Sequence, residues 1–162
     1  MIVLTGMPGA GKSTVGVVLA KRLGLRFIDS DLVIQERTGK LLHTLIEELG
    51  NEGFWQLEND INCTIDTQDA VVATGGSAIY GESAMEHFKK AGTVVYLQLP
   101  YEEIEDRLGD LAMRGVTVRN GQTLSDLYNE RKPLYEKYAS LTIDCSGKAL
   151  RDIVVEIAEK VK

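Results

Sequence analysis

The residues best suited to chemistry stand near the start of the chain, in the segment GMPGAGKST at residues 6–14. Glycines let a backbone curl with its N–H groups pointing inward around phosphate oxygens, and the positive end of a following helix adds to the attraction. Lys12 can reach terminal phosphates as a point charge, and the Ser13 hydroxyl can ligate Mg²⁺. The segment therefore predicts a site for a nucleoside triphosphate. Its match to the pattern G-x-x-x-x-G-K-[ST] runs through Gly6, Gly11, Lys12 and Ser13.

The elements on either side of this loop support the prediction. Residues 1–5, MIVLT, have the apolar character of a buried strand, and residues 12–23 have the pattern of a helix that stops at Gly24. A strand before the loop and a helix after it are the context that a phosphate loop requires. The residues expected to contact ATP are Gly9, Ala10, Gly11, Lys12, Ser13 and Thr14.

Two carboxylates follow the second predicted strand, in Asp29-Ser30-Asp31. Because ligands of open parallel sheets bind beyond the carboxyl ends of the strands, we expect both carboxylates beside the phosphate loop. Asp29 can hold Mg²⁺ through water, since Mg²⁺ prefers a few carboxylates and keeps its waters. Asp31 can accept the proton of an attacking hydroxyl. The alternative is that these residues only cap a helix, with Ser30 as the candidate N-cap.

A pair of glycines, Gly75 and Gly76, ends the third predicted strand and is followed by Ser77. Paired glycines let a backbone approach a ligand closely, so this turn is a second candidate wall of the site. An ordinary turn is the alternative.

Arginines near a long polar segment supply further positive charge. Residues 109–122 form an irregular stretch whose length is typical of a functional loop, and we expect a mobile lid there. Arg114 and Arg119 lie inside this stretch, and Arg107 and Arg131 lie on either side. Because phosphoryl transfer requires cations around the migrating group, a lid can deliver them while excluding water. Solvated surface positions are the alternative for Arg114 and Arg119.

The rest of the chain must position these residues. Its 162 residues suit one domain with a proper core, and short apolar runs alternate with amphipathic helical segments. This alternation predicts an α/β fold in three layers, α/β/α, with a five-stranded parallel sheet. Strands are expected at residues 1–5, 26–29, 70–74, 93–99 and 141–145, and helices at 12–23, 30–39, 41–50, 51–65, 82–92, 101–108, 123–139 and 149–161.

Composition narrows the possible partners. The net charge of −6 argues against nucleic acid, which requires a basic footprint, and no apolar run reaches membrane-spanning length. The N-terminus lacks the pattern of a secretory signal. Cys63 and Cys145 have no metal-ligand spacing and are expected to be free thiols in a reducing cytosol. We therefore expect a cytoplasmic monomer that acts on ATP and a small metabolite, with no nucleic acid and no membrane.

Taken in order, the motifs make the chain resemble the shikimate kinases, small P-loop kinases of the nucleoside-monophosphate-kinase type, over nearly its whole length. The resemblance rests on the order and spacing of several segments together rather than on the phosphate loop alone. These segments are GMPGAGKSTVG, FIDSD, IQERTG, GNEGFWQLE, GGSAI and RKPLYEKYA.

The resemblance implies an ATP-dependent enzyme with Mg²⁺ that phosphorylates a hydroxyl of a small metabolite, namely shikimate, to 3-phosphoshikimate. It implies one P-loop kinase domain over residues 1–162, with the lid at about 109–122 and an acceptor-binding helical region at about 31–66. Lys12 and Ser13 would serve the phosphates and the metal, Asp29 would help to hold the metal, and Asp31 would bind the acceptor hydroxyl.

The same resemblance assigns the arginines and the glycine turn. Arg114 would be the lid arginine that reaches the ATP phosphates, Arg107 would lie on adenine, and Arg131 would bind the shikimate carboxylate. The catalytic set is then Lys12, Asp31 and Arg114, and the residues that face the acceptor are Asp31, Trp55, Gly75, Gly76, Ser77 and Arg131.

Three positions depart from the family pattern. Ser77 replaces a third glycine, Gly115 follows the lid arginine where proline is usual, and Trp55 stands where the family has a second carboxylate-binding arginine. By this correspondence Trp55 should line the acceptor pocket. Exchange of arginine for tryptophan removes a planar cation, at a cost of about 2–5 kcal/mol for a buried carboxylate pair. Two alternatives then remain for the carboxylate: Arg131 holds it alone, or Arg119 also reaches it.

Other interpretations of Trp55 stay open at the level of the sequence. One alternative is that the acceptor is a sugar, a polyol or another ring acid that suits a tryptophan face, and another is that the indole simply packs one helix on another. A module that only senses nucleotide is the alternative outside the enzymes. The presence of Asp31 argues against it, since a sensor need not keep a carboxylate that faces a hydroxyl group.

Overall fold

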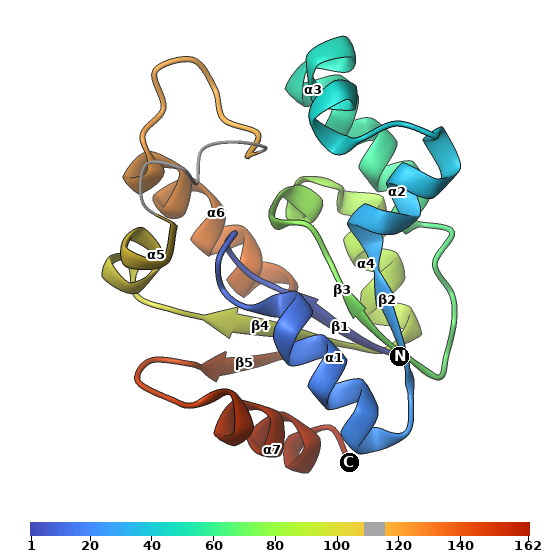
Figure 1. Ribbon diagram of the computed structural model, residues 1–162, viewed down its shortest axis with the longest axis vertical. Helices are drawn as coiled ribbons and strands as arrows, with labels where there is room; N and C mark the ends of the chain where they lie inside the picture. Colours follow the sequence, from blue (N-terminus) through green and yellow to red (C-terminus); the bar gives the residue numbers. More distant parts are fainter. Residues whose placement is uncertain (109–115) are drawn as a thin grey trace.

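Five parallel strands form a single sheet in the order β2-β3-β1-β4-β5 (Figure 1). The computed structural model describes residues 1–108 and 116–162. Residues 2–5 of β1 pair with β3 on one side and with β4 on the other, so the strand before the phosphate loop lies at the centre of the sheet. The strands are β1 (Ile2–Thr5), β2 (Arg26–Asp29), β3 (Ala70–Ala73), β4 (Thr93–Gln98) and β5 (Leu141–Asp144).

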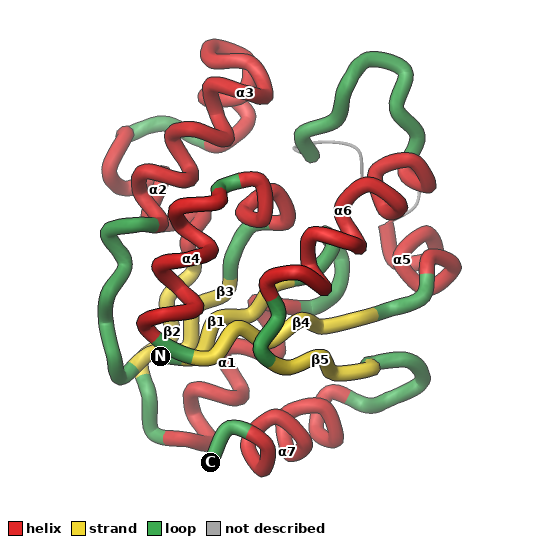
Figure 2. The backbone as a smooth tube through the Cα atoms, turned by 180° about the vertical axis from the view of Figure 1, so that it is seen from behind, coloured by secondary structure: helices red, strands yellow, loops and turns green. Residues whose placement is uncertain are grey.

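Helices cover both faces of the sheet, as the alternation in the sequence predicts. Figures 1 and 2 show α1 and α7 on one face and α4 and α6 on the other, while α2 and α3 stand above the β2 side. The three-layer prediction is therefore confirmed. The helices are α1 (Lys12–Leu23), α2 (Ser30–Thr38), α3 (Leu42–Asn62), α4 (Glu82–Ala91), α5 (Tyr101–Leu108), α6 (Leu124–Tyr138) and α7 (Leu150–Lys160), with a 3₁₀ helix η1 (Gly76–Tyr80).

Two helix boundaries show how the local chemistry sets the fold. Helix α1 ends at Gly24, whose φ of 69° is the left-handed conformation that glycine adopts without strain. The N-cap of α2 is Asp29 and not Ser30, which corrects the sequence-based prediction. The Asp29 carboxylate accepts hydrogen bonds from the backbone N–H groups of Asp31 and Leu32, and a carboxylate suits the positive end of the helix better than a hydroxyl.

The region between β2 and β3 has its own small core. The two helices predicted at 41–50 and 51–65 meet at Gly50, where φ 71° and ψ 176° break the helical path within α3. Ile34 from α2 packs with Leu45, Phe54 and Ile61 from α3, apart from the main core around the sheet. Helices α2 and α3 are therefore held together by their own apolar contacts, separately from the core around the sheet.

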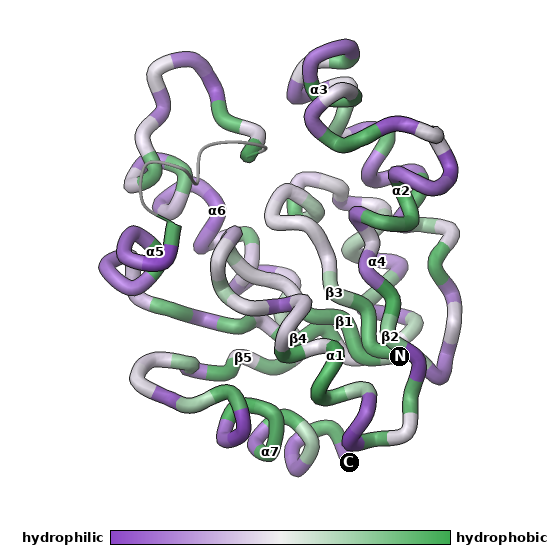
Figure 3. Tube along the Cα trace, in the orientation of Figure 1, coloured by the Kyte–Doolittle hydropathy of each residue, from purple (hydrophilic) through white to green (hydrophobic). Residues whose placement is uncertain are grey.

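Apolar character is concentrated where the strands lie (Figure 3). All four residues of β1 and of β3 are buried, as a sheet covered on both faces requires. None of the helices in the described ranges combines the length and the apolar character that are needed to cross a lipid bilayer.

Candidate active site

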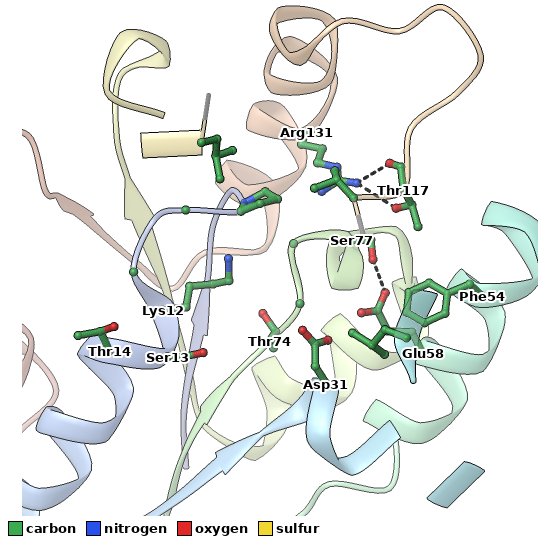
Figure 4. Close-up of a pocket in the computed structure, with 18 residues that line it drawn as sticks. Lys12, Ser13, Thr14, Asp31, Phe54, Glu58, Thr74, Ser77, Thr117 and Arg131 are labelled. Atoms are coloured by element: carbon green, nitrogen blue, oxygen red, sulfur yellow. Dashed lines mark hydrogen bonds between the residues drawn. The ribbon is translucent and has the colours of Figure 1, made fainter. Parts of the chain in front are cut away.

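A cavity of about 500 Å³ lies beyond the carboxyl ends of β1, β2 and β3. Its walls come from the phosphate loop and α1, from α2 and α3, from the turn after β3 with η1, from residues 116–117 and from α6 (Figure 4). The position agrees with the expectation that ligands bind at this edge of an open parallel sheet. The residues predicted from the sequence that line it are Gly9, Gly11, Lys12, Ser13, Thr14, Asp31, Gly75, Gly76, Ser77 and Arg131.

The phosphate loop requires glycine at specific positions. Gly9 has φ +81°, a conformation that side chains rarely adopt, and a Cβ atom there would lie 2.8 Å from Cδ2 of Leu108, which would have to move. Ala10, the predicted ATP contact between Gly9 and Gly11, is buried and is not among the residues that line the cavity. The loop therefore surrounds the predicted phosphate position chiefly with backbone.

Lys12 lies inside the loop that it is expected to serve. Its ammonium donates to the carbonyl oxygens of Gly6 at 2.7 Å and Met7 at 2.9 Å, and the residue is buried. Burial lowers the pKa of Lys12 to about 8, and the nearby Asp31 carboxylate opposes that change. Among the described residues its hydrogen-bond acceptors are neutral carbonyl groups, and such a buried cation is a favourable partner for phosphate oxygens.

Ser13 and Asp29 form the candidate metal edge. The Ser13 hydroxyl donates to Oδ2 of Asp29 at 3.3 Å, while Oδ1 of the same carboxylate caps α2. The capping alternative and the metal prediction are therefore compatible, because each uses a different oxygen. Asp29 is not among the residues that line the cavity, which fits contact with a metal through water.

Asp31 lies between the two sides of the cavity, as Figure 4 shows. Burial raises the pKa of Asp31 to about 6, Asp29 adds to that rise, and Lys12 opposes it. A carboxylate with this pKa is ionised at neutral pH and is a stronger base than an ordinary aspartate. Asp31 is therefore suited to accept a proton from a hydroxyl group.

Gly75 separates Asp31 from a second carboxyl group, that of Glu58. A Cβ atom on Gly75 would lie 2.7 Å from Oδ1 of Asp31 and 2.9 Å from Oε2 of Glu58. Any side chain at this position would displace one of the two carboxyl groups. The absence of a side chain at Gly75 therefore allows both carboxyl groups to lie close to this turn.

Glu58 is a residue that our sequence-based assignment of the site missed. It is 1% exposed, it lines the cavity, and burial raises its pKa to about 8. Ser77 donates to Oε1 of Glu58 at 2.7 Å, so the serine that departs from the family pattern supplies the partner of this carboxyl group. A signal was present in the sequence. Glu58 lies one turn after Phe54, on the apolar face of α3, where a glutamate is unusual.

Arg131 is completely buried in α6 and lines the cavity as predicted. Its Nη2 donates to the carbonyl oxygen of Thr117 at 2.9 Å and to Oγ1 of Thr117 at 3.1 Å, and its Nε donates to the hydroxyl of Tyr80 at 3.3 Å. Within the described residues Nη1 has no hydrogen-bond partner. Thr117, which is 3% exposed, is a second cavity residue that was not assigned from the sequence.

Trp55 is not among the residues that line the cavity. Its ring stacks on Tyr80 with 4.2 Å between the ring centroids, and its Nε1 donates to Oγ1 of Thr117 at 2.9 Å. Arg119 lies over the indole, 5.8 Å from its centroid, and forms an ion pair with Glu130. Neither Trp55 nor Arg119 extends into the cavity in this conformation.

The remaining predicted arginines are Arg107 and Arg114. Nη1 of Arg107 donates to the carbonyl oxygen of Gly9 at 3.1 Å, so this side chain lies on the outer surface of the phosphate loop. Arg114, Gly115 and residues 109–115 of the predicted lid lie outside the described residues.

The two sides of the cavity have complementary chemistry. The phosphate loop and Lys12 offer N–H groups and a cation, and the opposite wall offers Arg131 together with two carboxyl groups. A phosphate donor and an anionic acceptor with a hydroxyl group can therefore occupy one cavity, with Asp31 between them.

Comparison with known proteins agrees with this arrangement. The family model for shikimate kinase matches residues 8–162. A shikimate kinase from Geobacter sulfurreducens is 39% identical over 99% of this chain and 90% of its own length, and one from Bacillus cytotoxicus is 33% identical over 99% and 97%. The solved structure of a shikimate kinase from Acinetobacter baumannii in complex with shikimate superposes with a TM-score of 0.88 at 37% identity, covering 99% of this chain and 91% of that one.

Proposed function

The chain belongs to the shikimate kinase family, and on that premise we propose that it transfers the γ-phosphoryl group of ATP to the 3-hydroxyl of shikimate. One observation carries the proposal most directly. Lys12 of the phosphate loop and the carboxylate of Asp31 line the same cavity, beside a buried arginine. The cavity thus contains the groups that a phosphoryl donor and an anionic hydroxyl acceptor both need.

On the donor side, the loop backbone and Lys12 would bind the ATP phosphates. Lys12 would exchange its two carbonyl contacts for phosphate oxygens, which restores a full charge partner to a cation whose pKa is lowered by burial. Arg107 would contact the adenine side, since it already lies against the loop at Gly9. Arg114 keeps its assignment to the ATP phosphates as a prediction.

The oxygen atoms at the metal edge fit Mg²⁺, a hard cation that prefers hydroxyl, carboxylate and water ligands. Ser13 Oγ and Asp29 Oδ2, which lie 3.3 Å apart, would hold it. When bound with ATP, the ion would neutralise charge on the phosphate oxygens.

On the acceptor side, Asp31 would orient the 3-hydroxyl and take its proton at a carboxylate oxygen. Arg131 would bind the carboxylate of the acceptor. Glu58, whose pKa is raised to about 8, is mostly protonated at neutral pH and so would not repel an anionic acceptor. Gly75 would let both carboxyl groups lie close to the backbone of this turn.

We further propose that the protein acts as a cytoplasmic monomer, with residues 109–122 as its lid and residues 31–66 as its acceptor-binding region. The two free cysteines fit a reducing compartment, and the net charge of −6 argues against nucleic acid as a partner. Sedimentation velocity at micromolar concentration tests the oligomeric state.

ADP release measured with Mg²⁺, ATP and saturating shikimate, against a blank without acceptor, tests the proposed activity. We expect turnover at rates ordinary for small-molecule kinases, about 1–100 s⁻¹. The variant Trp55→Arg is measured in parallel, because the indole does not line the cavity and wild type should need no second cation there.

Two outcomes would contradict the shikimate assignment. If only Trp55→Arg responds, the tryptophan has changed the acceptor, and a panel of sugars, polyols and ring acids should be tested. If neither protein responds although ATP still binds, shikimate is not the substrate.

A further inference from the structure

The contacts of Thr117 with the buried guanidinium go beyond what the proposed function requires. Thr117 presents two oxygen atoms, its backbone carbonyl and its hydroxyl, and both accept from Nη2 of Arg131, at 2.9 and 3.1 Å. A carboxylate also presents two oxygens to a guanidinium. Thr117 places both of its oxygens on one nitrogen, Nη2, which a carboxylate bound through two nitrogens would also use.

The geometry of a guanidinium explains how the contacts of Thr117 compete with a carboxylate for Arg131. Two parallel N–H pairs can bind a carboxylate through both of its oxygens, one formed by Nε and Nη2 and the other by Nη1 and Nη2. Both pairs include Nη2, which donates to Thr117 twice. Nη1 remains without a partner among the described residues, and Arg131 is 0% exposed. Thr117 therefore competes with a carboxylate for the nitrogen that both pairs share.

Other side chains hold Thr117 at this position. Nε1 of Trp55 donates to its hydroxyl at 2.9 Å, and Nδ2 of Asn51 donates to the carbonyl oxygen of the next residue, Val118, at 2.6 Å. The indole is itself fixed by its stack on Tyr80. Residues 117–118 are thus bound to α3 by two hydrogen bonds that do not involve Arg131.

We propose that Thr117 and Trp55 determine how tightly the acceptor binds: Thr117 competes with the acceptor carboxylate for Arg131, and Trp55 holds Thr117 in that position. This inference rests on the proposed function, because it requires an acceptor with a carboxylate. Trp55 then acts on the acceptor through Thr117 and is a positioning residue that does not touch the substrate.

Substitution of Thr117 or Trp55 should change the affinity for the acceptor in the opposite direction to a substitution that damages the site. Removal of the Thr117 hydroxyl or of the indole N–H weakens the competitor, so the acceptor should bind more tightly. A purely structural role for either residue predicts weaker binding or none. An increase in affinity therefore distinguishes the two interpretations.

Isothermal titration calorimetry with shikimate, without nucleotide, tests the proposal on intact protein. Thr117→Val keeps the shape of the side chain and removes the hydroxyl, and Trp55→Phe keeps a ring on Tyr80 and removes the N–H donor. Thr142→Val, an exposed threonine of β5, is the matched control. We expect the Kd of Thr117→Val to fall roughly three- to tenfold and that of Trp55→Phe roughly two- to fivefold, with Thr142→Val unchanged.

Fluorescence gives a second readout, because Trp55 is the only tryptophan of the chain. Shikimate should shift the emission of wild type, since displacement of Thr117 releases the indole N–H. In Thr117→Val, where that hydrogen bond is already absent, the shift should be smaller. Thermal unfolding of each variant checks that the fold is retained.

The outcomes separate this proposal from the proposed function. If wild type turns over shikimate but Thr117→Val binds it equally or more weakly, the competition is refuted and the kinase assignment stands. If Thr117→Val binds shikimate and wild type does not, the competition is supported, but shikimate is then not the substrate of wild type. If neither binds shikimate, both proposals fail.

Discussion

The phosphate loop and the acceptor side of the cavity differ in how far apart their residues lie in the sequence. The loop is one stretch, residues 6–14, that acts largely through its backbone and one lysine. The acceptor side collects side chains from α2, α3, η1, the segment at Thr117 and α6. The first region is determined locally, and the second exists only when the helices pack.

The two regions also differ in how they manage charge. In the loop, the ammonium group of Lys12 donates to two neutral carbonyl groups, so its charge is available to bind an anion. The acceptor side holds Asp31 and Glu58, both with raised pKa, next to an arginine that is paired to Thr117 by neutral oxygens. Small changes on the acceptor side should therefore alter affinity and pH dependence, whereas changes in the loop should abolish activity.

The largest effect is expected at the loop. Lys12→Met removes the cation that binds the terminal phosphates, and we expect kcat/KM for ATP to fall by roughly 10³-fold or more. Steady-state kinetics with circular dichroism as a fold control measure this. Retention of more than a tenth of the activity would show that the loop backbone alone suffices, and the contrast between the two regions would weaken.

Asp31 tests the boundary between the regions. The variant Asp31→Asn removes the proton acceptor and should lower kcat by roughly 10²- to 10³-fold. In wild type, kcat/KM should fall below pH about 6 as Asp31 becomes protonated, and above pH about 8 as Lys12 loses its proton. A pH–rate profile from pH 5 to 9 measures both limbs. An acid limb that persists unchanged in the residual activity of Asp31→Asn would assign that limb to another group.

Arg131 tests whether the acceptor side acts separately from the loop. Arg131→Met should raise KM for shikimate by roughly 10²-fold, because a buried charged partner of the carboxylate is lost, and should leave KM for ATP nearly unchanged. Initial rates with each substrate varied in turn give both constants. Equal changes in both would mean that the two regions are coupled through Arg131.

Glu58 links the acceptor side to the pH dependence of stability. Burial raises the pKa of Glu58 from its ordinary 4.5 to about 8, so the folded state holds a proton that the unfolded state releases. This penalty is absent below pH about 4.5, grows as the pH rises, and is complete above about 8. Glu58→Gln should therefore match wild type near pH 4 and exceed it in free energy of unfolding by an amount that grows from pH 5 to pH 8.

Urea unfolding at several pH values measures this difference. The matched control is Glu86→Gln, an exposed glutamate of α4. A constant difference between Glu58→Gln and wild type across pH 4 to 8 would show that folding does not change the pKa of Glu58.

The success of the sequence-based predictions follows the same division. The strands, the loop and Asp29 with Asp31 were predicted because each depends on neighbours within a few residues. The N-cap of α2 was placed one residue late, since Ser30 and Asp29 are both good caps and only the geometry chooses between them. The role of Glu58 was missed because its partner, Ser77, is 19 residues away.

The position of Trp55 also could not be predicted from the sequence pattern around it. Its correspondence to a carboxylate-binding arginine suggests a position in the cavity, but the indole stacks on Tyr80 and binds Thr117 instead. The partner of its N–H group lies 62 residues away in the sequence. No periodicity within α3 contains that information.

By itself, the sequence determined the phosphate loop, the order of strands and helices, and the set of ionisable residues available to the site. These depend on backbone conformation and on apolar patterns, which act over short distances along the chain. Only the tertiary structure decided which carboxyl groups are buried, that Nη2 of Arg131 is shared by two oxygens of Thr117, and that Trp55 lies outside the cavity. The physical reason is that burial and charge pairing depend on contacts between α3, α6 and residues 116–118, which become neighbours only when the chain folds.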